Sequence, residues 1–310
     1  MSYLKRVLKS VWHFWFGPIE LIRLRAFEIC FTASFLAYFF VARFFYWEEW
    51  LTPAGYHYPR GATPSYLIDP FPLLSGWAAL LLGAVAVAAG VSLCLGKWRR
   101  PASGVLFLAA VYIQNADALS AYALNVHYIV GFLVLFLSPG PSDPGNQSLS
   151  ARQIGSAWPI RTLQVTLLLQ LFTAGWCKLQ IGDWWNHSDV LWTHLQGPYR
   201  NHLSAWMLRV IPMWGFTVMQ WSAFIFELVA PVFLLFRWTR WIALIWGVGF
   251  VSFIALTMND LVYFCLQLAS YLILFLSAAE LSRVHRSVSG WWALFRSRLP
   301  GKKEVEPSAP

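Results

Sequence analysis

The sequence predicts an all-α protein, a polytopic membrane helix bundle with about eight transmembrane helices. Of its 310 residues, 58% are hydrophobic and only 12% are charged, whereas charged residues make up about a quarter of a typical soluble domain. Aromatic residues reach 18%, with 19 tryptophans, and such rings collect where helix ends meet the membrane interface. This composition indicates an integral membrane protein, and we expect it in the plasma membrane of a bacterium.

A membrane-spanning helix needs about 20 consecutive apolar residues, and the chain contains eight segments close to that length. In chain order they cover residues 20–45, 74–96, 102–118, 121–138, 160–179, 213–236, 239–257 and 260–278. Pro101, Pro212 and the run of Gly, Pro, Ser and Asn at 139–149 interrupt the apolar pattern and mark connections. The third and fourth segments are short and closely joined, so the helical hairpin that they would form is the least well supported by the apolar pattern. Residues 20–278 constitute one membrane domain.

Two further segments flank this domain. Residues 1–19 place Lys5, Arg6 and Lys9 before a mixed apolar and polar stretch, which predicts an amphipathic helix in the membrane interface rather than a cleaved signal peptide. Residues 279–310 begin with a basic aromatic stretch, which we expect to lie on the inner leaflet as an amphipathic segment. The last ten residues are expected to be a disordered tail.

The positions of the 23 lysine and arginine residues predict the orientation. Most of them fall at the two termini and in the connections near 97–100, 139–161 and 237–240, which share one side of an eight-helix bundle. By the positive-inside rule that side is the cytoplasm, so both termini are cytoplasmic and the long loops 46–73 and 182–212 face out. The net charge of +9 is scattered over helix ends rather than gathered in one stripe, so nucleic acid is not an expected partner.

Lys178 is the residue that indicates chemistry most directly. It follows the apolar run from Leu163 to Cys177. Next to hydrocarbon, a lysine either extends its ammonium group to the interface or is desolvated, and desolvation favours the neutral amine, which is a base. The first alternative makes Lys178 an interfacial anchor. The second requires it to face other helices, and the small residues Ala174 and Gly175 one turn earlier allow a close helix contact there.

His127, Asn125 and Glu227 are the other candidates inside apolar segments. Asn125 and His127 lie early in the fourth segment, at a depth that matches Lys178 in this topology. A membrane histidine either satisfies a hydrogen bond to a neighbouring helix or donates to a substrate oxyanion. Glu227 lies near the middle of the sixth segment. An acid there is costly, so it either fixes helix packing through a polar partner or belongs to a functional site.

Metal binding is not expected from the sequence. The four cysteines are far apart and form no C-x-x-C pair, and His187, His194 and His202 are spaced too irregularly for a zinc motif. Phosphate-loop, dinucleotide and nucleophile-elbow motifs are also missing from the sequence.

A short motif resembles a known family. The sequence Ala-Gly-Trp-Cys-Lys-Leu at 174–179, followed by Asp183 and Trp184, resembles the HTTM family of membrane domains, which includes the vitamin K-dependent gamma-carboxylase. The Asn-Val-His-Tyr sequence at 125–128 is similar to the carboxylase segment that carries its active-site histidine. Weaker similarities lie at residues 52–55, 227–231 and 258–259. The resemblance extends from about residue 20 to 278.

The resemblance implies roles for these residues. Lys178 would be the base that deprotonates a reduced quinone, and His127 would stabilise developing oxyanion character. Oxygen would convert the quinone to a strongly basic alkoxide, which would remove a carbon-bound proton before carbon dioxide adds. The residues expected to bind substrate are Asn125, Asp183, Trp184, Glu227 and Asn259.

Two functions are therefore expected as alternatives. The first is a modifying enzyme that uses a reduced, vitamin K-like quinone and acts at the extracytoplasmic face on a lipid or on an exported peptide or protein. The second is a non-catalytic or accessory membrane protein, which binds lipid in the same pocket or helps to mature an exported peptide. HTTM proteins linked to secreted peptide toxins suggest this second role.

Overall fold

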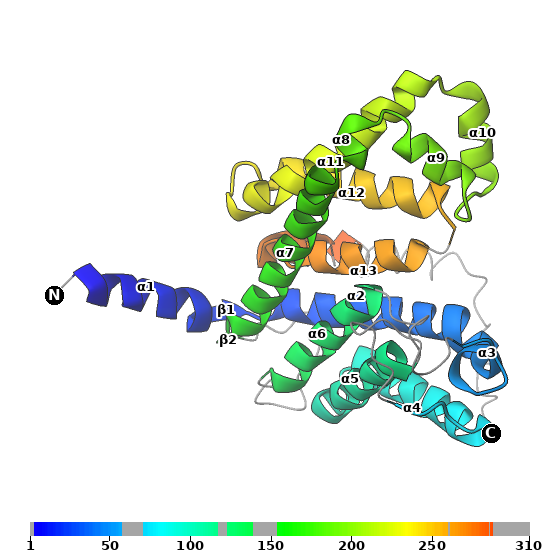
Figure 1. Cartoon of the computed structure of the whole chain (residues 1–310). Coiled ribbons are helices and arrows are strands. Elements are labelled where there is room, and N and C mark those ends of the chain that lie inside the picture. Colours follow the sequence, from blue (N-terminus) through cyan, green and yellow to red (C-terminus); the bar gives the residue numbers. More distant parts are fainter. Residues whose placement is uncertain are drawn as a thin grey trace, which may run out of the picture.

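The computed structural model describes residues 3–57, 71–116, 123–138, 154–259, 261–284 and 286–287. Within these ranges the chain is mainly helical (Figure 1), and each of the eight predicted apolar segments contains a helix. These helices are α2 Ile22–Ala37, α4 Gly76–Cys94, α5 Arg99–Ala116, α6 Ala123–Leu137, α7 Trp158–Ile181, α11 Met213–Leu235, α12 Arg240–Thr257 and α13 Val262–Ile273. The all-α prediction is confirmed.

Four helical segments of the described residues are long and apolar enough to cross a membrane. They are Ile22–Leu51, Gly76–Cys94, Met213–Leu235 and Arg240–Thr257. Two shorter helices, Leu124–Leu137 and Val262–Ile273, are also apolar. α5 begins with two arginines, and α7 contains polar residues along its length, so neither reaches the same mean hydropathy. The chain is a membrane protein, whereas eight spans and the orientation of the termini stay predictions.

The remaining elements are short and lie mostly outside the eight predicted segments. α1 Tyr3–Phe16 is the predicted N-terminal helix, and it exposes Trp12 and Phe14. α2 continues through a π-helical turn, η1 Tyr38–Arg43, and a 3-10 turn, η2 Phe44–Tyr46, into α3 Trp47–Leu51. The long loop after α7 forms α8 Asp183–Asn186, α9 Val190–Gln196 and α10 His202–Val210.

Two strands add a feature that the sequence analysis did not predict. β1 Pro18–Glu20 pairs antiparallel with β2 Ile154–Ser156, with Ile19 opposite Gly155. Strands of three residues are too short to show an alternating pattern. The predicted connection at 139–149 and residues 288–310, which hold most of the basic aromatic segment and the tail, lie outside the described residues.

The core is an aromatic cluster around α2. Phe27, Phe31 and Phe35 recur every fourth residue, so they share one face of the helix, and each is at most 1% exposed. They pack against Tyr128 of α6 and Tyr271 of α13, with ring centroids between 5.0 and 5.5 Å apart. α2 is therefore the central helix that holds α6 and α13 in place.

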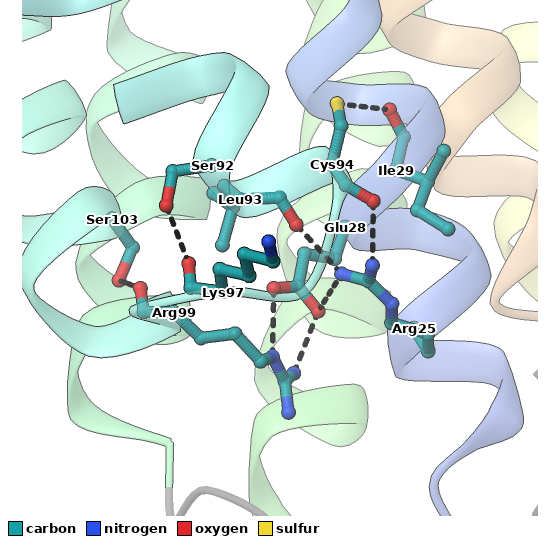
Figure 2. A network of polar contacts seen from close by, with 9 residues as sticks. All are labelled: Arg25, Glu28, Ile29, Ser92, Leu93, Cys94, Lys97, Arg99 and Ser103. Atoms are coloured by element: carbon teal, nitrogen blue, oxygen red, sulfur yellow. Dashed lines mark hydrogen bonds and ion pairs between the residues drawn. The ribbon is translucent and has the colours of Figure 1, made fainter. Parts of the chain in front are cut away.

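A buried charge network fixes α2 to the turn between α4 and α5 (Figure 2). Glu28 is fully buried, and its two carboxylate oxygens accept hydrogen bonds from Arg99 Nε and Nη2 at 2.8 and 2.6 Å. Arg25 lies 3.2 Å from the same carboxylate. Arg25 also donates to the carbonyl oxygens of Leu93 and Cys94, at 2.8 and 2.6 Å, which satisfies acceptors at the C-terminal end of α4.

Candidate functional site

Lys178 and Glu227 form an ion pair between α7 and α11. Lys178 Nζ lies 2.7 Å from Glu227 Oε1, and the two side chains are 22% and 7% exposed. Gly175, one turn earlier on α7, brings the helices together, because a Cβ there would come within 3.0 Å of the backbone nitrogen of Leu228. The lysine therefore faces another helix rather than acting only as an interfacial anchor.

Trp184 covers the lysine from the other side. Lys178 Nζ lies 4.1 Å from the centroid of a Trp184 ring, a distance at which the ring face attracts an ammonium group. α7 ends at Gly182, whose φ of 85° allows the chain to turn directly into α8. That turn places Trp184 over the end of α7 and beside Lys178.

Gln220 holds this turn in position from α11. Its side chain is fully buried, and Oε1 accepts the backbone N–H of Leu191 at 3.0 Å. Its Nε2 donates to the carbonyl oxygens of Trp184 and His187 at 3.0 and 2.7 Å. One side-chain amide thus ties α8 and α9 to the helix that carries Glu227.

Lys178, Glu227 and Trp184 line one end of an apolar pocket of about 600 Å³. The rest of the wall comes from α9, α11, α12 and α13. The apolar side chains of this wall include Leu191, Met219, Phe250, Phe253, Met258 and Phe264. Ligand pockets of this volume are typically apolar with a few polar groups that fix orientation, and the ion pair provides those groups here.

The second carboxylate oxygen of Glu227 has no partner in the part of the chain that the structure describes. Oε2 is buried and makes no hydrogen bond with any described residue. A buried carboxylate oxygen without a donor is costly, so Glu227 keeps a capacity to accept a hydrogen bond that no described residue uses.

His194 adds a third titratable side chain, beside Lys178 and Glu227, to the pocket lining. Its ring centroid is 6.1 Å from that of Trp184, and its Nδ1 lies 2.9 Å from the carbonyl oxygen of Val190. A carbonyl can only accept, so Nδ1 carries a proton and donates to it. From the sequence, His194 is excluded as a zinc ligand by its irregular spacing from His187 and His202, and no motif in the loop identifies it as a pocket residue.

Asn259 fastens the outer end of the pocket. Its backbone N–H donates to the carbonyl of Tyr199 at 2.9 Å, and its side-chain amide donates to that of Arg200 at 3.4 Å. The preceding residue, Met258, lines the pocket and forms a β-bridge with Arg200. Asn259 was predicted to bind substrate, and in the structure it links the turn after α12 to the chain before α10.

The structure does not bring His127 to Lys178. His127 lies at the contact between α6 and α13, where its ring centroid is 6.2 Å from that of Tyr271 and its carbonyl accepts the Tyr271 hydroxyl. Asn125 is buried near it on α6, and neither residue is among the described residues that line the pocket. Asp183 is exposed at the start of α8. Of the predicted site residues, only Lys178, Trp184 and Glu227 meet in the pocket.

The described residues hold no group of three or more histidine, cysteine or acidic side chains arranged to bind a metal ion. No family model, curated protein or solved structure matches this chain.

Replacing Gln220 tests how the pocket is held together. We expect Gln220→Leu to cost about 3 kcal/mol of stability, because it leaves a buried N–H and two carbonyl oxygens without their partner. Trp184 should then leave Lys178, which increased protease cleavage within 183–191 would report. Gln196→Leu, on the exposed side of α9, is the control and should change neither property.

Proposed function

We propose that this membrane protein binds an apolar, hydroxyl-bearing ligand of the reduced-quinone class in the pocket between α7, α11 and α12. The Glu227 carboxylate carries the proposal, because it lines the pocket and its Oε2 atom has no donor among the described residues. A quinol O–H would supply that donor once the carboxylate turns toward the ligand. The apolar walls of the pocket suit the ring and the prenyl chain of such a ligand.

The ion pair is suited to moving a proton. Lys178 and Glu227 are in hydrogen-bond contact, so the proton of the ammonium group can pass to the carboxylate and leave a neutral amine. Lys178 then holds a lone pair at the pocket wall and accepts the ligand hydroxyl proton. A bound quinol supplies the electrons for the reaction with oxygen.

The accessory role is the second candidate, and the position of His127 favours it. The resemblance implies a histidine beside the lysine, whereas His127 lies at the α6–α13 contact. The described residues that line the pocket instead include His194. A pocket that binds quinol or lipid without its oxyanion donor would serve maturation of an exported peptide as a binding protein.

We also propose that the termini are cytoplasmic and that the pocket faces the extracytoplasmic side. Arg25, Arg99, Arg161 and Arg240 lie at the starts of α2, α5, α7 and α12, and Figure 1 shows α1 at the same end as the starts of α2 and α7. This clustering supports the positive-inside assignment. Lys178 lies near the opposite end of α7.

Gly249 provides a sharp test because it lines the pocket and an added Cβ there would meet nothing within 4 Å. Gly249→Leu should fill the cavity without a clash. It should also stabilise α12 by about 0.5–1 kcal/mol, since leucine is a better helix former than glycine. We expect binding of a prenylated naphthoquinol to weaken at least about tenfold through the lost cavity volume, measured by tryptophan fluorescence in nanodiscs.

Gly249→Ala is the matched control, because it gains helix propensity but adds only one methyl group. Oxygen-dependent quinol oxidation that disappears in Gly249→Leu and in Lys178→Ala supports the enzyme. Binding without oxidation supports the accessory role. Wild-type protein that binds no quinol, or equal binding by the leucine and alanine variants, contradicts the proposal.

A further inference from the structure

A second cavity lies at the end of the bundle where α2, α7 and α12 begin, far along α7 from Lys178. Its volume is about 240 Å³. The arginines that line it are Arg23 on α2, Arg161 on α7, and Arg237 and Arg240 at the turn into α12. Figure 1 shows the start of α7 and the turn between α11 and α12 on the left of the bundle, toward α1. We call this cavity the arginine pocket.

Three of these arginines contain buried donors for which the described ranges of the chain provide no acceptor. The Nε atoms of Arg23, Arg161 and Arg240 are buried and make no hydrogen bond with any described residue. Buried polar atoms in native proteins are nearly always paired, and a charged donor left unpaired is especially costly. These three arginines line one cavity, so their unpaired guanidinium nitrogens leave positive charge beside it that a bound anion would offset.

The surrounding residues balance only part of the positive charge. Arg240 Nη2 lies 2.9 Å from Glu280 Oε1. Arg23 is attracted by Glu20 and Glu280 but repelled by Arg161 and Arg240. Among the described residues, two carboxylates thus oppose four guanidinium groups. The repulsion is a cost to the fold that an anion would remove.

We propose that the arginine pocket binds a phosphate group, carried by an anionic lipid headgroup or by a free phosphate ion. Guanidinium groups match phosphate oxygens in planar, two-point hydrogen bonds, and several oxygens on one phosphorus can satisfy donors from three helices together. Basic pockets between helix ends at a membrane surface bind lipid headgroups in this way. Leu235 lines the pocket and is 65% exposed, so acyl chains could continue past it.

The test compares the whole protein under two pairs of conditions. In non-ionic detergent, inorganic phosphate is compared with chloride at equal ionic strength. In nanodiscs, phosphatidylcholine alone is compared with phosphatidylcholine containing phosphatidic acid. Arg237→Gln is the cleanest variant, because Arg237 is exposed and makes no hydrogen bond or ion pair within the described ranges. Arg161→Gln removes a buried donor, and the exposed Arg100→Gln at the start of α5 is the matched control.

We expect phosphate or phosphatidic acid to raise the Tm of the wild type and of Arg100→Gln. Arg237→Gln and Arg161→Gln should each weaken the binding of phosphate or phosphatidic acid by about tenfold or more, because each removes one charged hydrogen-bonding group. A response to inorganic phosphate identifies a free-phosphate site, whereas a response to phosphatidic acid alone identifies a headgroup site. An absent response, or equal responses in the wild type and both pocket variants, would overturn the proposal. The Gly249→Leu variant should respond like the wild type.

Discussion

Lys178→Met is expected to destabilise the protein by about 3 kcal/mol or more, because it leaves the carboxylate of Glu227 buried without its cation. The Glu227 side chain is only 7% exposed, so water cannot replace the ammonium group. Reversible unfolding in detergent micelles measures the loss. Glu227→Gln should cost less, since the Lys178 side chain is 22% exposed and its head can turn toward water.

The double variant separates charge from packing. Lys178→Met together with Glu227→Leu removes both charges and fills similar volume, so it should recover most of the lost stability. The exposed Lys97→Met is the control for losing a lysine. An exposed ion pair contributes less than about 1 kcal/mol of stability. A loss of stability that small in Lys178→Met would contradict a buried pair and would make Lys178 an interfacial anchor.

The second large effect is expected at Glu28. Glu28→Gln should cost about 3–5 kcal/mol, because it leaves the guanidinium groups of Arg99 and Arg25 without their shared carboxylate in a buried site. Thermal unfolding should show the loss directly. Separation of the α4–α5 turn from α2 should also raise hydrogen exchange at residues 95–98, because Arg25 and Arg99 hold both ends of that turn.

Glu280→Gln is a matched comparison for this prediction. Glu280 also pairs with an arginine, Arg240, but its side chain is 17% exposed, whereas that of Glu28 is 1% exposed. Because solvent screens it more, this second pair should contribute about 1 kcal/mol or less. Similar losses in both variants would show that burial does not set the strength of these contacts.

The sequence predicted the helices well, because apolar length is a local property. The Arg25–Glu28 contact is local in the same sense, because the two residues are three positions apart on one helix and lie 3.2 Å from each other. Arg99 could not be paired with Glu28 from the sequence, since that contact depends on how α5 turns back toward α2. The strands β1 and β2 were also missed, because each has only three residues and is recognised by its pairing with the other, which is distant in the sequence.

The candidate site was predicted as single residues but not as a group. Lys178 and Glu227 were each identified by their cost in an apolar segment, and Gly175 indicated the close contact that joins their helices. Their pairing was not predicted, because hydrophobic patterns do not say which helices are neighbours. His127 matched Lys178 in depth along the bundle, but depth does not fix the position around it. Gln220 is a polar amide inside the apolar segment 213–236. The cost of a polar group there, which identified Glu227, could also have identified Gln220.

The loop that forms α8, α9 and α10 is held in place at both ends, which limits the routes by which a ligand can reach the pocket. Gln220 holds α8 and α9 at one end, and Asn259 holds the chain before α10 at the other. Val218 and Gly249 line the pocket and are exposed on the outer surface of α11 and α12. For the ligand proposed above, entry between these two helices would follow the plane of the bilayer. Its occupancy would then depend on its concentration in the lipid, so partitioning would select ligands before the pocket does.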